Sequence, residues 1–125
     1  MAWLNRLQPY TLALLRIVTA LLFLQHGLSK MVGFPNPGQK LSHFVSLIGL
    51  AAVLEVVGGA LLVVGFRTRL VAFILSGEMA VAYFKAHAPH GFYPILNGGE
   101  GAILFCFIFL YLACAGGGAC SMDRR

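Results

Sequence analysis

The chain has 125 residues, of which 59% are hydrophobic and only 10% are charged, and its formal net charge is +5. Soluble domains carry about 25% charged residues, so the composition excludes an ordinary soluble domain and indicates a membrane protein. The positive charge does not indicate a nucleic-acid-binding protein, because no basic cluster exceeds Arg124–Arg125. The basic residues stand instead at the ends of apolar runs, as topology signals do.

Four apolar runs along the chain predict four membrane-spanning helices, since about 20 apolar residues cross the hydrocarbon of a bilayer. We place these spans at about 10–31, 44–65, 70–86 and 100–115. The runs lack the period-two alternation of membrane strands, and the basic turn 66–69 is short enough only for an antiparallel hairpin. The predicted fold is all-α, a single domain over residues 1–125 that forms a transmembrane four-helix antiparallel bundle.

The first span resembles a signal peptide only superficially, because its apolar stretch 12–28 contains Arg16 and ends without a small-residue cleavage site. We expect it to remain as a helix. At about 100° per residue, Arg16, His26 and Lys30 share one face of this helix and form a polar stripe. Arg16 either snorkels to the near interface or forms a buried pair with Glu55 or Glu78.

Glu55 lies in the middle of the second span, inside an apolar run (44–66) that holds no other charge. A carboxylate at that depth costs several kcal/mol unless it is paired, protonated or faces a polar cavity. Its neighbours three and four positions away are small: Ala51, Ala52, Gly58 and Gly59. Small residues let another helix approach closely, so we expect this acid to face the bundle interior, where it either fixes packing or serves as a ligand or proton site.

Glu78 is the second acid within a span, and Lys85 lies two turns further along the same helix face. A pair between these two would give Glu78 a structural role only. Otherwise it joins Glu55 and Arg16 as a candidate for handling protons within the membrane.

Polar residues converge at the end of the bundle away from the termini, which we expect to be the outer end. His26 and Lys30 close the first span and lie level with Lys85, with the loop 87–99 and with Glu100, so three histidines meet there: His26, His87 and His90. This convergence is the strongest functional indication in the sequence, although the loop histidines also fit a plain interfacial loop. A metal or haem site on His26 and His87 lacks a further ligand at the expected spacing, so no metal is predicted.

Basic residues predict the orientation. On the side of the termini we expect Arg6, Arg67, Arg69, Arg124 and Arg125, and on the other side Lys30, Lys40 and Lys85. Excess Lys and Arg marks the cytoplasmic side, so both termini are predicted to be cytoplasmic.

The residues alone do not establish catalysis. No nucleophile–base arrangement, phosphate loop or zinc spacing occurs, and Cys106, Cys114 and Cys120 form no C-x-x-C. The cysteine spacing argues against thiol–disulfide exchange.

Five groups of residues, taken in order, resemble the DoxX family of small bacterial inner-membrane proteins over nearly the whole chain. They are Arg16 with His26–Lys30, Leu54–Gly59 with Gly65–Arg69, Glu78–Phe84 with His87, Pro94–Glu100, and Gly116–Gly118 with Ser121–Asp123. The resemblance implies a four-helix membrane bundle. It also marks eight polar positions as candidates: Arg16, His26, Lys30, Glu55, Glu78, His87, Asn97 and Glu100. Together with Lys85, those at the outer mouth are the predicted ligand-binding residues.

The resemblance implies more than one function. Some members look like subunits of a thiosulfate:quinone oxidoreductase, and other relatives are linked to redox-stress complexes or to chaperone-like assembly. Our first hypothesis is a redox-associated or quinone-linked subunit that binds a hydrophobic small molecule within the bundle. Glu55 and Glu78 would hold or relay protons, while Arg16 and Lys30 would stabilise anionic forms.

Two alternatives stay open. One is a non-catalytic assembly or chaperone-like subunit whose small-residue grooves hold a partner's helix. The other is a small-solute or proton-coupled transporter acting as an oligomer, because 125 residues make only half of the usual inverted-repeat architecture. The expected partners are the lipid bilayer, a membrane or peripheral redox protein and a second copy of the chain, without nucleic acid. Quinone is the cofactor under consideration, and whether the protein is an enzyme is left open.

Overall fold

The computed structural model describes residues 1–41 and 46–123, and within these ranges the chain is built of helices and turns without a strand. The four long helices are α1 (Ala2–Val32), α2 (Leu47–Val64), α3 (Thr68–Ala82) and α5 (Glu100–Ala115). The helix α3 continues into a π-helical turn, Tyr83–His87, and a 3-10 turn, Ala88–His90. Two short elements complete the chain, a 3-10 turn at Pro37–Gln39 and α4 at Pro94–Asn97.

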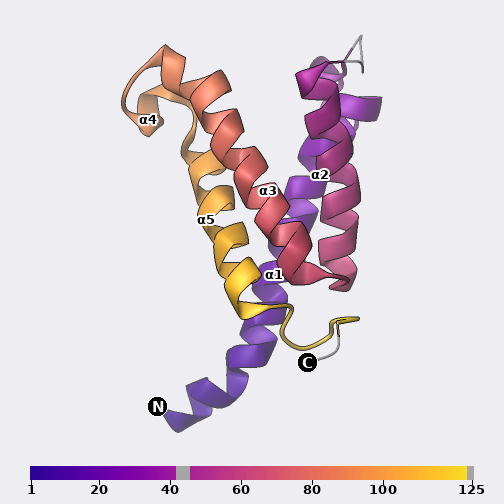
Figure 1. Cartoon of the computed structure of the whole chain (residues 1–125), viewed down its shortest axis with the longest axis vertical. Helices are drawn as coiled ribbons and strands as arrows, with labels where there is room; N and C mark the ends of the chain where they lie inside the picture. Colours follow the sequence, from indigo (N-terminus) through magenta and orange to yellow (C-terminus); the bar gives the residue numbers. More distant parts are fainter. Residues whose placement is uncertain (42–45, 124–125) are drawn as a thin grey trace.

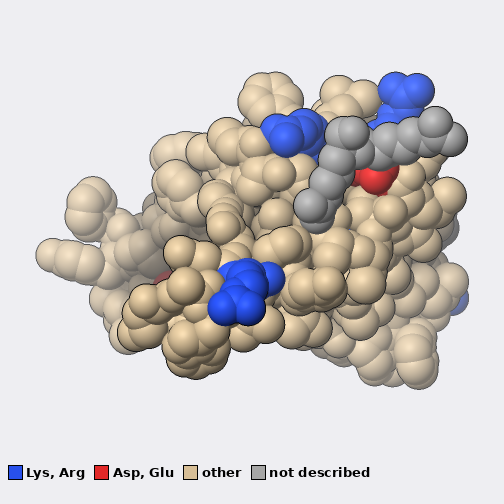
Figure 2. All heavy atoms as spheres, turned by 90° about the horizontal axis from the view of Figure 1, so that it is seen from below, with Lys and Arg blue, Asp and Glu red and all other residues tan. Residues whose placement is uncertain are grey.

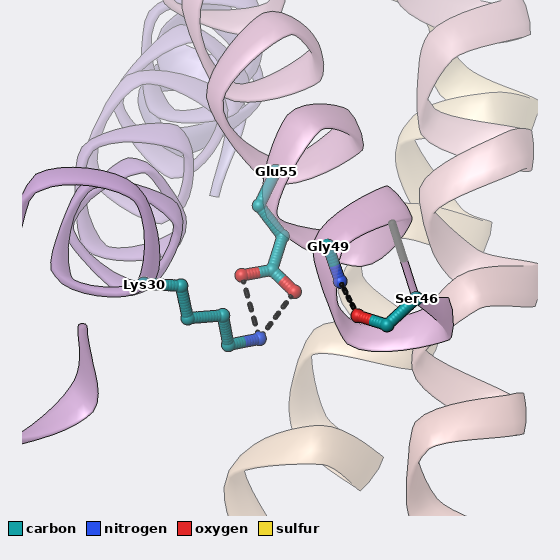
Figure 3. Close-up of polar contacts among 4 residues, drawn as sticks. All are labelled: Lys30, Ser46, Gly49 and Glu55. Atoms are coloured by element: carbon teal, nitrogen blue, oxygen red, sulfur yellow. Dashed lines mark hydrogen bonds and ion pairs between the residues drawn. The ribbon is translucent and has the colours of Figure 1, made fainter. Parts of the chain in front are cut away.

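The helix ends follow local chemistry. The helices α1 and α2 both end at a glycine in the left-handed conformation, Gly33 and Gly65, each with φ of 73°. A glycine adopts this conformation without the clash that a Cβ would cause. At the start of α2, the Ser46 hydroxyl accepts a hydrogen bond from the Gly49 N–H at 3.0 Å (Figure 3). The predicted start of the second span, Phe44, lies outside the described residues, and α1 begins at Ala2, earlier than the predicted first span.

The long helices pack as two pairs, with α1 along α2 and α3 along α5, while α2 and α3 share a smaller contact (Figure 1). Both termini and the α2–α3 turn lie at one end of the molecule, which we call the terminal end. The segments 33–41 and 83–99 lie at the other, which we call the loop end. The pairs meet in a core in which the Phe23 ring lies edge-on to Phe109 with ring centres 4.9 Å apart. Leu75 packs directly on Gly58, where a Cβ would lie 2.9 Å from its methyl carbons.

In the part of the chain that the structure describes, three helical segments are long and apolar enough to cross a membrane: Ala2–Val32, Leu47–Val64 and Thr68–His90. The fourth long helix, α5, is apolar but has only 16 residues. Large apolar side chains such as Leu14, Val57, Phe73 and Phe107 are exposed on the outer surface of these helices. A surface of this kind is stable in lipid, because helices satisfy their backbone hydrogen bonds internally.

The C-terminal tail, residues 116–123, folds back over the terminal end and covers Arg16. The guanidinium of Arg16 is 0% exposed and donates hydrogen bonds to the carbonyl oxygens of Gly117, Ala119 (3.2 Å) and Cys120 (2.7 Å). The predicted pair of Arg16 with Glu55 or Glu78 is therefore wrong, because its guanidinium contacts these carbonyl oxygens and Glu55 pairs with Lys30. Snorkelling of Arg16 to the near membrane interface stays a prediction. A guanidinium has five N–H donors and can therefore bind several carbonyl oxygens at once. The three carbonyl oxygens of the tail lie beyond the end of α5, so they have no partner within a helix.

Candidate functional site

An ion pair joins the last turn of α1 to the middle of α2. The ammonium of Lys30 lies 3.0 Å from Oε1 and 2.8 Å from Oε2 of Glu55 (Figure 3). The Glu55 side chain is 1% exposed and that of Lys30 is 27% exposed. Glycine at position 27 allows this approach, since a Cβ there would lie 2.9 Å from both the Glu55 Cβ and the Val56 nitrogen. The buried carboxylate is thus neutralised by a lysine that reaches in from the loop end.

Glu78 on α3 brings a second carboxyl group towards this pair. Both of its carboxyl oxygens are buried and have no hydrogen-bond partner among the described residues, although the group lies within electrostatic range of Glu55 and Lys30. The expected pair between Glu78 and Lys85 is wrong, because Lys85 is exposed and lies in no ion pair within the described ranges. Lys85 lies in the π-helical turn Tyr83–His87, so its angular position relative to Glu78 differs from that in a regular α-helix.

A cavity of about 500 Å³ lies beside these groups, between the two helix pairs and towards the loop end. Its walls are mostly apolar and come from α1, α2, α3 and α5. Six sequence-predicted residues line it: His26, Lys30, Glu55, Glu78, Lys85 and His87. The fold therefore gathers polar groups from three segments that are far apart in the sequence around one apolar space.

Three predicted residues do not line this cavity. Arg16 lies fourteen positions before Lys30, or roughly 21 Å along the helix at 1.5 Å per residue. Glu100 is exposed on the first turn of α5. Asn97 is buried and holds the loop together, because its side-chain N–H groups donate to the Tyr83 hydroxyl (3.1 Å) and the Gly91 carbonyl (3.0 Å).

The Asn97 network has a consequence for the cavity. The backbone oxygen of Asn97 lies 3.2 Å from Nδ1 of His87, which leaves the other ring nitrogen, Nε2, for a further partner. The oxygen of the Asn97 side chain accepts the Gly99 N–H at 2.8 Å. Asn97 thus positions the His87 ring, a cavity-lining residue, without lining the cavity itself.

The apolar wall was not identified from the sequence. It includes Leu47, Leu50 and Leu54 of α2, Met79 of α3 and Phe105 of α5. The three leucines are spaced by three and four residues and so share a helix face with Ala51 and Glu55. That spacing was the available signal, but the same pattern is produced by ordinary packing.

The arrangement suits a ligand with a polar head and an apolar body. The Lys30 ammonium can donate hydrogen bonds, the carboxyl groups of Glu55 and Glu78 can accept them, and the His26 and His87 rings can do either. Within the described residues, no group of three or more His, Cys, Asp or Glu side chains is placed to hold a metal ion.

Comparisons with known proteins identify a family and several relatives. The model of the DoxX family matches residues 11–88. An uncharacterized protein of Haemophilus influenzae is 46% identical, covering 98% of this chain and 95% of its own length. "Putative oxidoreductase CatD" of Bacillus subtilis is 31% identical over 88% of this chain and 82% of its own length. "Inner membrane protein YphA" of Escherichia coli is 29% identical over 94% and 91%, respectively. No solved structure gives a significant match.

Proposed function

The chain belongs to the DoxX family of membrane proteins, and on that premise we propose that its cavity binds a hydrophobic redox-active molecule of the quinone class. The protein would act as a subunit linked to an oxidoreductase. The observation that carries this proposal is a mostly apolar cavity that is lined by the Lys30–Glu55 pair and by Glu78.

The size and chemistry of the cavity support this ligand class. A volume of about 500 Å³ falls within the usual range of small-molecule pockets, roughly 300–1,000 Å³. A quinone presents a flat apolar ring with two carbonyl oxygens, which accept hydrogen bonds. The Lys30 ammonium and the rings of His26 and His87 are the donors that could meet those oxygens, while Leu50, Leu54 and other apolar residues would contact the ring and its tail.

The two acids would have separate roles. Glu55 is engaged with Lys30 through both of its oxygens, so it holds the ammonium in place. Glu78 has no such partner among the described residues and would exchange protons with the ligand. A quinone takes up two protons with two electrons, and the electrons would come from a partner redox protein. The printed name of the Bacillus subtilis relative, which contains the word oxidoreductase, supports a redox role of this kind.

The proposed setting is a four-helix antiparallel bundle in the bacterial inner membrane, with α1, α2, α3 and α5 as its spans. The helix α5 has 16 residues and a length of about 24 Å, which suffices where the bilayer thins slightly. Both termini would be cytoplasmic. The basic residues at the terminal end, among them Arg6, Arg67 and Arg69, support this orientation.

The test is to purify the full-length protein in a mild detergent and to extract and identify bound small molecules by mass spectrometry. We expect close to one quinone per chain. Ala51→Phe places a ring in the cavity and should lower the bound quinone at least tenfold, whereas Ala60→Phe, on the exposed face of the same helix, should leave it unchanged.

A preparation that carries no quinone and shows no saturable binding of an added short-chain quinone would contradict the proposal. Equal quinone content in the two phenylalanine variants would also contradict it, because bound quinone would then lie outside this cavity. Co-purification of a protein partner without quinone would favour the assembly role instead.

A further inference from the structure

A second cleft, of about 810 Å³, lies at the terminal end, opposite to the quinone cavity. Its walls are formed by residues 8–12 of α1, the N-terminal end of α3, the C-terminal part of α5 and the tail. The residues that matter for its chemistry are Leu12, Arg67, Arg69, Leu70, Tyr111 and Asp123. This cleft plays no part in the function proposed above.

Positive charge dominates this end of the molecule. Arg67 and Arg69 line the cleft at the N-terminal end of α3, where the helix dipole adds partial positive charge. The carboxylate that lines it, Asp123, is already used: its oxygens accept the backbone N–H groups of Arg67 (2.6 Å) and Thr68 (2.9 Å). Figure 2 looks onto this end and shows several separate blue basic groups over it and little acidic red.

Hydrogen bonds chiefly determine the protonation of Asp123. Burial by itself would raise the pKa of Asp123, but hydrogen bonds from Thr68 and Arg67 and the charge of Arg16 together lower this pKa below its ordinary value. The carboxylate therefore stays ionised because its oxygens accept these hydrogen bonds.

The two arginines of the cleft differ in what they contact. The guanidinium of Arg69 donates to carbonyl oxygens at the C-terminal end of α5, including that of Cys114. The side chain of Arg67 is exposed, with its guanidinium carbon 5.8 Å from the centre of the Phe66 ring. Between residues 1–41 and 46–123, no carboxylate lies within ion-pair distance of Arg67. Among the described residues that line this cleft, Arg67 is thus the arginine that can meet an added anion.

The cleft also has an apolar rim. Leu70 and Tyr111 are exposed large side chains that line it on helices α3 and α5, and Leu12 lines it on α1. A free phosphate ion needs no such rim, whereas a phospholipid brings acyl chains along with its phosphate. Tyrosine is itself enriched at the depth of lipid headgroups.

We propose that this cleft binds the phosphate group of an anionic glycerophospholipid, with Arg67 as its principal cation and its acyl chains against Leu12, Leu70 and Tyr111. The lipid would be held at the junction of α1, α3, α5 and the tail.

The full-length protein in detergent, supplied with equal amounts of phosphatidylglycerol and phosphatidylcholine, can be examined by native mass spectrometry. We expect preferential retention of phosphatidylglycerol. One arginine near a membrane surface contributes about 1 kcal/mol to anion binding, so Arg67→Gln should lower this retention about fivefold. Arg67→Lys should restore most of it. Lys40→Gln removes an exposed charge at the loop end and serves as the matched control, with no change expected.

Equal phosphatidylglycerol retention in Arg67→Gln and Lys40→Gln would overturn the proposal, as would equal retention of both lipids by the native chain. In a separate experiment, inorganic phosphate is added to the protein that already holds phosphatidylglycerol. If millimolar inorganic phosphate displaced all of the bound phosphatidylglycerol, the site would be one for free phosphate and the lipid assignment would fail. None of these outcomes depends on whether quinone binds in the other cavity.

Discussion

The helix α1 carries two cationic side chains on the face that points into the bundle, Lys30 and Arg16. They contact different kinds of acceptor. Lys30, at the loop end, meets the carboxylate of Glu55 in a two-oxygen ion pair. Arg16, at the terminal end, meets three carbonyl oxygens of the C-terminal tail. The lysine is a compact charge that one carboxylate can neutralise, whereas the arginine is a planar fork that satisfies several acceptors at once.

The comparison shows that the role of a buried charge depends on whether it borders a cavity or is covered by another segment. The lysine pair borders a cavity, so a ligand can contact it. The arginine is sealed beneath the tail at 0% exposure, so it stabilises the closed terminal end.

The largest effect is expected for Arg16→Met. The carbonyl oxygens of Gly117, Ala119 and Cys120 would lose their donor in a buried place, and the tail would lose its attachment to α1. Charge-assisted hydrogen bonds contribute about 1.5–3 kcal/mol each, so the loss of these three should lower the free energy of unfolding by about 5 kcal/mol or more. A denaturant titration in detergent measures it. Arg6→Met, which changes an exposed residue of the same helix, is the control. If both substitutions lowered the free energy of unfolding by the same small amount, the stabilising role of Arg16 would be refuted.

A smaller loss is expected for Lys30→Met. The change leaves Glu55 without its cation and close to the second acid, Glu78, which should cost about 3 kcal/mol in unfolding free energy. Adding Glu55→Leu to this variant should recover most of that loss, because an apolar pair replaces an unpaired buried charge. The double-mutant cycle gives the coupling. Lys85→Met should change stability by less than about 0.5 kcal/mol, and a comparable loss there would argue against a specific Lys30 pair.

The smallest effect is expected for Asp123→Asn. Loss of the ionised cap of α3 should cost about 1 kcal/mol at neutral pH. Because folding lowers the pKa of Asp123, its contribution is present above the ordinary value of 3.8 and is lost as the pH falls through the lower, folded-state value. Thermal unfolding followed from pH 6 to pH 2 should therefore show a steeper acid loss for the native chain than for Asp123→Asn. Ser121→Ala, which removes a neighbouring hydrogen bond to Gly65, should keep the native pH dependence.

Much of the fold could be predicted from the sequence, because long apolar runs leave few alternatives to membrane helices. The interior position of Glu55 could also be predicted from the sequence, because small residues flank it on one helix face. The partner of Arg16 could not be predicted, because backbone carbonyl oxygens carry no residue identity and the glycine-rich tail has no periodicity. The absence of a Glu78–Lys85 pair could not be predicted either, since a π-helical turn leaves no clear mark in the sequence.

The attachment of the tail to Arg16 has a consequence for biogenesis. The nearest of the three acceptors lies 101 residues further along the chain, so at about 5–20 residues per second the ribosome needs roughly 5–20 s to reach it. During that interval the first helix is already made while its arginine still lacks these acceptors. The final seating of this arginine therefore depends on completion of the polypeptide.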